Sequence, residues 1–317
     1  MDAVDPALLS FLSVLACAAG ADLGLAILVL ALAPALGWAP PPGSLPLLTA
    51  PLVVGAGLAM YLAEGILEQH PTAFSVWHAF QRWVRLMALI LLAAMGTAGL
   101  TAPARLLLGA AMVALGLGAY VVTSGWHGMV VLRRLPRVSQ VLAALGQDVA
   151  FAALLVLALD RPVHAAVGTA ALVVVAGPRI PLAVRAHRAV VEAGRSWLRA
   201  LLGAGDWVAP DALPTSVVEG LSDEQRIPSL PRGTRALFLT RGLAHGWLLT
   251  GSGRAWYAGP GRAIVPVARA EGVPPPDPLH ARLFVTVGGQ PGELLVRRDG
   301  PSRTELEREI PISPRNE

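Results

Sequence analysis

Acidic side chains stand inside long apolar stretches of this sequence. Asp22 lies near the middle of the first stretch, and Glu64 and Glu68 lie one helical turn apart near the end of the second. An ionised side chain at the centre of a bilayer costs at least about 2.5–3.5 kcal/mol on insertion scales. Such carboxylates could bind a cation, relay a proton, or pair with arginines in a structural network. The candidate polar or ion site comprises Asp22, Glu64, Glu68, Arg85, His127, Arg134 and Asp148.

Three of these carboxylates also have a purely structural explanation. Asp22 is flanked by two glycines and could cap a half-helix that faces water. Glu68 could be solvated at the membrane interface. Asp148 begins the predicted fifth span, where a carboxylate suits the helix dipole. For Glu64, a functional role and a structural ion pair remain open alternatives.

Metal, cofactor and enzyme chemistry find little support in the residues. His70, His78 and His127 could bind a metal with Glu68, but no pair of them has a helical ligand spacing. Cys17 is the single cysteine, which excludes disulfides and zinc–cysteine clusters within one chain. We find no nucleophile–base pair, metal motif or phosphate-binding loop, and we therefore predict no cofactor and no enzyme.

The composition is that of a membrane protein. Apolar residues make up 54% of the chain and charged residues only 15%, against about 25% in soluble domains. The charge density rises sharply after residue 178, which predicts a membrane part followed by a soluble part. The net charge of +4 comes without an aromatic-interleaved basic groove, so we exclude a nucleic-acid partner.

The apolar stretches predict an all-α polytopic bundle of about six transmembrane helices. The first, residues 6–38, is too long for one straight span and is expected to be broken around Asp22. The others are expected at residues 47–67, 84–100, 106–126, 148–159 (with a start as early as 141) and 163–176, and residues 70–83 are read as a polar connector. Two inverted halves of three helices are compatible with this order.

The arginines set the expected orientation. Six of them, Arg82, Arg85, Arg133, Arg134, Arg137 and Arg179, fall on one side of the predicted spans, and only Arg105 and Arg161 fall on the other. The basic side is expected to be cytoplasmic. We therefore predict a multi-pass protein of the inner (cell) membrane with both termini in the cytoplasm.

Residues 179–205 predict an amphipathic juxtamembrane helix on the cytoplasmic leaflet. Its polar face would contact anionic lipids through Arg185, Arg188, Arg195 and Arg199. A cytoplasmic extension of the sixth span is the alternative.

The remainder of the chain predicts a small soluble domain. We read residues 206–231 as a linker, residues 232–300 as a small all-β domain of six short strands, a barrel or sandwich, and residues 301–317 as a disordered tail. The membrane domain is then residues 1–178. The oligomeric state stays open, a homo-oligomer included.

The membrane part resembles a bacterial membrane family known as domain of unknown function 4126. Residues that match its first motif without gaps are Glu64, Pro71, Ser75, Trp77 and Arg85, while Glu68, Gln69 and His78 replace an aspartate, a lysine and an aspartate. Its later motif is matched, with a shortened loop, by His127, Arg134, Ser139 and Asp148, while Val130 and Gln147 replace a lysine and a glutamate. Asp22 stands where the family often has an arginine. The resemblance covers about residues 6–178 and implies no particular activity.

Three functions follow from this reading. The first is a small transporter or channel-like protein with a polar site between its helices. The second is a membrane scaffold that recruits a protein partner through its β domain. The third is a membrane enzyme acting on lipid headgroups, which no motif supports.

Overall fold

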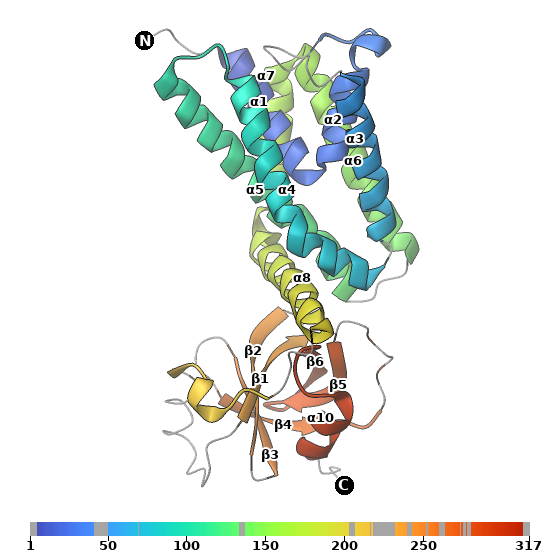
Figure 1. The fold of residues 1–317 in the computed structure, drawn as a ribbon, viewed down its shortest axis with the longest axis vertical. Coiled ribbons are helices and arrows are strands. Elements are labelled where there is room, and N and C mark those ends of the chain that lie inside the picture. Colours follow the sequence, from blue (N-terminus) through green and yellow to red (C-terminus); the bar gives the residue numbers. More distant parts are fainter. Residues whose placement is uncertain are drawn as a thin grey trace. The chain divides into compact units, whose positions relative to one another are not determined.

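The computed structural model describes residues 5–40, 50–68, 70–132, 137–202, 207–215, 217, 232–239, 243–251, 253–259, 264–272, 274, 277 and 280–312. The chain divides into two compact units, Met1–His187 and Arg188–Glu317 (Figure 1). The division falls within the residues of α8 (Ile180–Leu201).

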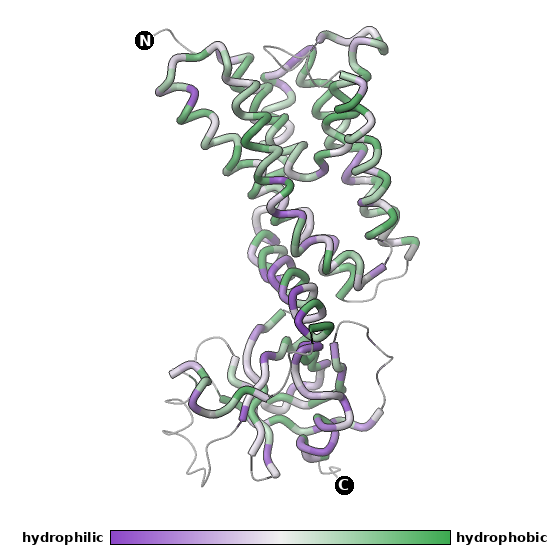
Figure 2. The backbone as a smooth tube through the Cα atoms, in the orientation of Figure 1, coloured by the Kyte–Doolittle hydropathy of each residue, from purple (hydrophilic) through white to green (hydrophobic). Residues whose placement is uncertain are grey.

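The described elements of the first unit are all helices. Its elements are α1 (Pro6–Ala21), α2 (Leu23–Leu32), η1 (Pro34–Leu36), α3 (Pro51–Leu67), α4 (Pro71–Gly96), α5 (Ala102–Leu132), α6 (Arg137–Asp160), α7 (Pro162–Ala176), η3 (Gly177–Arg179) and the first part of α8 (Ile180–Leu201). Figure 2 shows that α1 to α7 are predominantly apolar, whereas α8 also carries many hydrophilic residues.

Four helical stretches among the described residues are long and apolar enough to cross a membrane: Thr72–Gly96, Ala102–Leu132, Val141–Asp160 and Pro162–Leu201. The helices α1, α2 and α3 are apolar but shorter. A multi-pass helical region is therefore present, whereas the count of six spans stays a prediction.

The first apolar stretch is broken at Asp22, as predicted. Asp22 has an extended backbone (φ −145°, ψ 107°) between α1 and α2, and its side chain caps α2 by accepting the Leu25 N–H at 2.8 Å. Glycines let other helices approach this break closely. A Cβ on Gly20 would lie 2.0 Å from the Gly116 carbonyl oxygen of α5, and one on Gly24 would lie 2.8 Å from the backbone of α3. Small residues thus set the packing around the break.

The predicted connector at residues 70–83 is wrong, because α4 begins at Pro71 and runs unbroken through it. Proline is favourable at the first helical position, because a backbone N–H there would have no partner within the helix and its absence costs nothing. The polar side chains of this stretch are not a solvated loop. Ser75, His78, Gln81 and Arg85 are all buried, and their spacing places them on one face of α4.

For the fifth span, the earlier of the two predicted starts agrees with the structure, because the apolar stretch of α6 is Val141–Asp160 and not 148–159. The helix α6 begins at Arg137, so Asp148 lies near its middle, and a capping role is excluded. The polar residues before Asp148 extend the helix instead of preceding it.

The second unit contains a six-stranded antiparallel barrel, in agreement with the six predicted strands. Its strands are β1 (Arg232–Leu239), β2 (Leu243–Gly251), β3 (Arg254–Ala258), β4 (Ile264–Arg269), β5 (His280–Val287) and β6 (Gln290–Arg297). Each strand pairs with its neighbour in sequence, and β6 returns to β1 with Ala236 opposite Val296, which closes the barrel. The closed ring leaves no free sheet edge.

The barrel also orders the segments around it. The expected disorder from residue 301 is wrong for α10 (Arg303–Glu309), which begins with a capping box between Ser302 and Glu305. Leu306 and Ile310 belong to the barrel core and are 0% and 1% exposed. In the expected linker, Val208 pairs with Gly233, and residues 218–231 lie outside the described residues.

The end of α8 that belongs to the second unit packs on the same barrel. Ser196 donates a hydrogen bond to Asp299 at 2.7 Å, and Arg199 pairs with Asp299 at 3.1 Å. One of the four arginines expected to contact lipid is therefore engaged by the protein. Arg188 and Arg195 are exposed.

Candidate functional site

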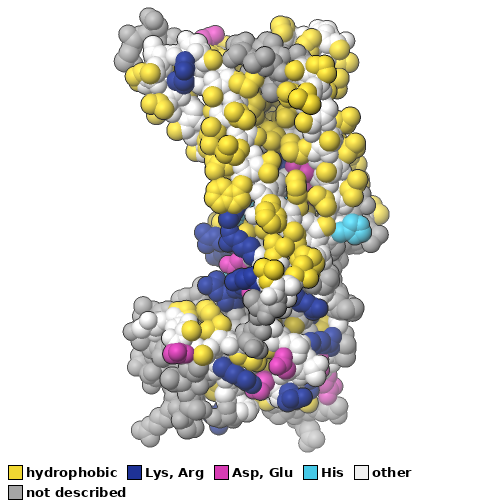
Figure 3. Space-filling view, in the orientation of Figure 1, with side chains coloured by type: hydrophobic (Ala, Val, Ile, Leu, Met, Phe, Trp, Pro, Cys, Tyr) yellow, Lys and Arg dark blue, Asp and Glu magenta, His cyan; other side chains and the backbone are white. Residues whose placement is uncertain are grey.

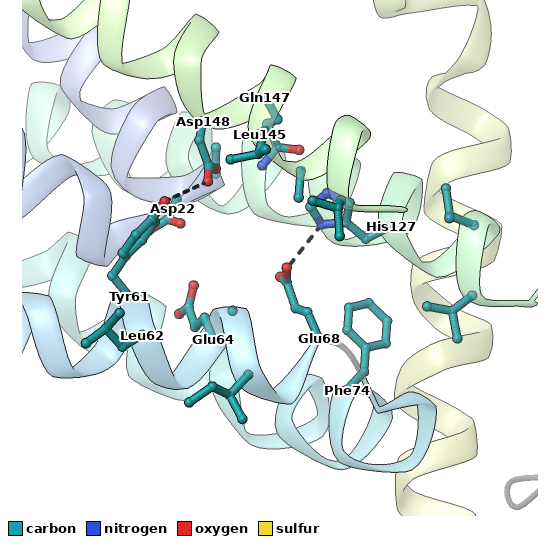
Figure 4. Close-up of a pocket in the computed structure, with 17 residues that line it drawn as sticks. Asp22, Tyr61, Leu62, Glu64, Glu68, Phe74, His127, Leu145, Gln147 and Asp148 are labelled. Atoms are coloured by element: carbon teal, nitrogen blue, oxygen red, sulfur yellow. Dashed lines mark hydrogen bonds and ion pairs between the residues drawn. The ribbon is translucent and has the colours of Figure 1, made fainter. Parts of the chain in front are cut away.

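A pocket of about 460 Å³ lies inside the helical unit, beside the break between α1 and α2. Four carboxylates line it: Asp22, Glu64, Glu68 and Asp148. They come from the break itself, from α3 and its end, and from α6. Figure 4 shows Glu64 and Glu68 pointing into the space that Asp22, Asp148 and His127 border. The fold thus gathers carboxylates that are up to 126 residues apart in the sequence, from residue 22 to residue 148.

Glu64 is held in a buried network on the α4 side of the pocket. Its side chain accepts a hydrogen bond from the Arg85 guanidinium at 3.0 Å and another from the Gln81 amide at 2.6 Å. Glu64, Gln81 and Arg85 are 4%, 2% and 3% exposed. A buried carboxylate with a paired arginine and a second donor has its charge satisfied. Glu64 therefore belongs to the framework of the site.

Arg85 also ties α4 to the broken helix. It donates to the carbonyl oxygens of Ala19 and Gly20 at 3.1 and 2.7 Å, and its guanidinium lies over the Tyr120 ring at 5.2 Å. The last carbonyls of a helix lack intrahelical partners and carry the negative end of its dipole. A cation at this point stabilises the end of α1, which the break leaves open inside the protein.

Asp148 and Tyr61 close the pocket next to Asp22. The Tyr61 hydroxyl donates to Asp148 at 3.1 Å, which joins α3 to α6. Asp148 lies near the middle of α6 and therefore does not cap a helix. Its hydrogen-bond partner, the Tyr61 hydroxyl, is uncharged. Within the described part of the chain no arginine pairs with Asp148.

Glu68 and His127 face each other at the end of α3, where Glu68 lies 3.7 Å from Nδ1 of His127. The Nε2 atom of His127 is buried and has no hydrogen-bond partner in the described residues. His78 is directed elsewhere, with its Nδ1 on the Phe74 carbonyl oxygen. No group of three or more His, Cys, Asp or Glu side chains in the described ranges is arranged to hold a metal ion.

The outer edge of the pocket is apolar. Leu62 and Ile66 of α3 and Val141 and Leu145 of α6 line it and are each at least half exposed. Figure 3 shows a small acidic area between the hydrophobic side chains of the helical unit. In a membrane, this edge would meet lipid, while the carboxylates lie behind it.

Most of the candidate residues are brought together. Asp22, Glu64, Glu68, His127 and Asp148 line the pocket, and Arg85 supports it through Glu64, whereas Arg134 lies outside the described residues. The sequence reasoning missed the role of Gln81. One signal was present, since Gln81 lies one helical turn before Arg85 and therefore on the same face of α4.

The family model Domain of unknown function (DUF4126) matches residues 9–179. This range is more than half of the chain and includes every residue of the pocket, while the barrel lies outside it. Comparisons with curated proteins and with solved structures gave no match. Four of the residues that suggested the resemblance lie at or beside this pocket, Glu64 and Arg85 of the first motif and His127 and Asp148 of the second, and the chain belongs to the DUF4126 family.

Proposed function

We propose that this protein is a small membrane transporter or channel-like protein that moves a cationic solute through the carboxylate-lined pocket. The observation that carries the proposal is the excess of carboxylates over arginines. Four carboxylates line the pocket, and one arginine, Arg85, pairs with one of them among the described residues. The sequence contains no lysine. A bound cation would supply the missing charge.

The broken helix supports the same proposal. In many transporters, substrate and ion sites lie where a membrane helix is interrupted, because the unwound backbone offers unpaired polar groups at mid-membrane. Here the interruption carries a carboxylate, Asp22, on the pocket wall. Irregular backbone at membrane depth is tolerated where protein or a water-filled cavity covers it.

Electrical recording from proteoliposomes on a solid-supported membrane tests this function. The full-length protein should give transient currents on a step of ammonium or alkylammonium ions, and none on a matched step of anions. Asp22→Asn should lower the current at least tenfold, whereas Asp160→Asn should keep it. Asp160 is the matched control because its side chain is 80% exposed, at the turn between α6 and α7. Currents equal to those of empty liposomes, or an unaffected Asp22→Asn variant, would contradict the proposal.

The scaffold remains a second candidate, favoured by the barrel. The barrel has its own core and lies outside the family match. Deletion of residues 209–317 separates the two functions, because a transporter should keep basal flux without the barrel and a scaffold should lose its function.

The proposed location is the inner membrane with both termini in the cytoplasm, supported by the arginine asymmetry. We propose that Arg188 and Arg195 contact anionic lipid on that side. Reporter fusions after residues 43, 103, 136, 160 and 205 test this topology. A periplasmic signal at residue 136 or 205 would contradict it.

A further inference from the structure

We propose that the cation taken by this pocket is amphiphilic: an organic ammonium head that sits among Asp22, Asp148 and Glu68, with an apolar body that lies along the outer edge formed by Leu62, Ile66, Val141 and Leu145. This inference rests on the proposed function for its transport role, but the binding it predicts is measurable without transport.

The head is identified by charge and by aromatic rings. Glu64 is already neutralised by Arg85 at 3.0 Å, which leaves three carboxylates on the wall without an arginine in the described structure. Tyr61 and Phe74 add ring surfaces to the same wall. Carboxylates with aromatic faces are the recognition chemistry of ammonium ions, since a ring attracts a cation held over it.

The pocket is also too roomy for a bare ion. About 460 Å³ is within the range of small-molecule sites, roughly 300–1,000 Å³. In addition, the buried Nε2 of His127 has no partner in the described part of the protein, although the His127 ring lines the pocket. A polar atom buried without a partner is costly, and a hydroxyl or amine of a ligand could satisfy it.

The body is identified by the outer edge. Leu62, Ile66, Val141 and Leu145 are 54%, 63%, 50% and 50% exposed and border the pocket that the carboxylates line. A solute with an alkyl or aryl part can cover these side chains while its head reaches the carboxylates.

The test is binding to the full-length protein in lipid nanodiscs with three probes. Hexyltrimethylammonium carries both the head and the body, tetramethylammonium carries the head alone, and hexanesulfonate carries the same body with the opposite charge. We expect hexyltrimethylammonium to bind at least tenfold more tightly than either other probe. Equal affinity for the cationic and the anionic hexyl probes would overturn the charge assignment, and equal affinity for the two ammonium ions would overturn the apolar body.

Variants locate the binding site. Asp148→Asn and Leu145→Asn should each weaken hexyltrimethylammonium at least fivefold, and Asp160→Asn should not. Protection of the Cys17 thiol confirms that each variant is folded, because Cys17 is buried in α1. Unchanged binding in a folded Asp148→Asn protein would place the probe elsewhere and refute the proposal. Binding without any proteoliposome current would refute the transport function but leave the ligand assignment intact. Currents that occur only with small ions would refute the amphiphilic ligand but leave the transport function intact.

Discussion

The ion pair between Arg85 and Glu64 offers the sharpest test of the framework around the pocket. Arg85→Met removes a 3.0 Å ion pair and two donors to helix-end carbonyls at 2.7 and 3.1 Å. It leaves Glu64 as a buried charge with Gln81 as its remaining donor. Removal of one partner of a buried pair costs about 3–5 kcal/mol, and we expect a loss of stability in that range.

Glu64→Gln should be milder. The new amide keeps an oxygen that can accept from Gln81, and Arg85 keeps its two carbonyl partners. The loss is then one hydrogen bond to a charged group, about 1.5–3 kcal/mol. Because both changes remove the same contact, the double variant should lose less than the sum of the two, with a coupling of about 0.5–3 kcal/mol.

The assay uses the chain's one cysteine. Cys17 is buried in α1, 8% exposed, so its reaction with a fluorogenic maleimide during a titration with dodecyl sulfate reports unfolding of the helical unit and not of the barrel. Arg161→Met is the control, since its pair with Asp160 is 67% and 80% exposed and worth about 0–1 kcal/mol. Equal losses for Arg85→Met and Arg161→Met, or strictly additive effects of Arg85→Met and Glu64→Gln, would refute the reasoning.

Three further outcomes are expected. Gly20→Ala should destabilise the helical unit by about 3 kcal/mol, the upper end of the cost of overpacking, because the new methyl group would clash with the backbone of α5. The control is Gly55→Ala, whose new methyl group has no atom within 4 Å and which should be neutral or stabilising by up to about 1 kcal/mol. Both effects are measured in the same Cys17 thiol assay. Leu306→Ala should cost the barrel about 2–5 kcal/mol, read as a lowered urea midpoint by near-ultraviolet circular dichroism; an unchanged midpoint would show that α10 is not part of the core. Hydrogen bonds from the hydroxyl and the backbone N–H of Ser302 lower the pKa of Glu305 below its ordinary 4.5, so the stability from this cap is present above pH 4.5 and lost as the pH falls below it. Ser302→Ala removes the hydroxyl and should reduce this acid dependence, and an unchanged pH profile would contradict the prediction.

The break and its carboxylate were predictable because their signal is local. Glycines on both sides of a charged residue inside an apolar stretch predict an interrupted membrane helix. The six strands were predictable for the same kind of reason, since alternation and glycine turns lie within each hairpin. The choice of a barrel over a sandwich was not, because it depends on the pairing of Ala236 with Val296, 60 residues away, between β6 and β1.

The misassigned segments share a cause: polar residues in helices were read as ends or loops. Ser75, His78 and Gln81 looked like a connector, yet each is buried on a face of α4. Asp148 looked like a helix start, yet its partner Tyr61 lies on a different helix. Whether a polar residue within a helix is solvated or buried depends on the side chains of other helices that contact it, and the sequence does not show these contacts. The prediction of a disordered tail was wrong for α10, although the capping box between Ser302 and Glu305 is a local signal for a helix. The high charge of this segment favoured the prediction of disorder.

The proposed function requires that the pocket is accessible to water and attracts cations. A single cysteine at Ala144, which lines the pocket, in a Cys17→Ala background leaves all four carboxylates in place. We predict that this thiol reacts with a membrane-impermeant trimethylammonium methanethiosulfonate at least tenfold faster than with the anionic sulfonate analogue. The preference should fall when Asp148 is changed to Asn. A control cysteine at Val174, 75% exposed on α7, should react with neither reagent. Equal rates for the two reagents, or complete protection of position 144 from both sides of the membrane, would contradict the claim.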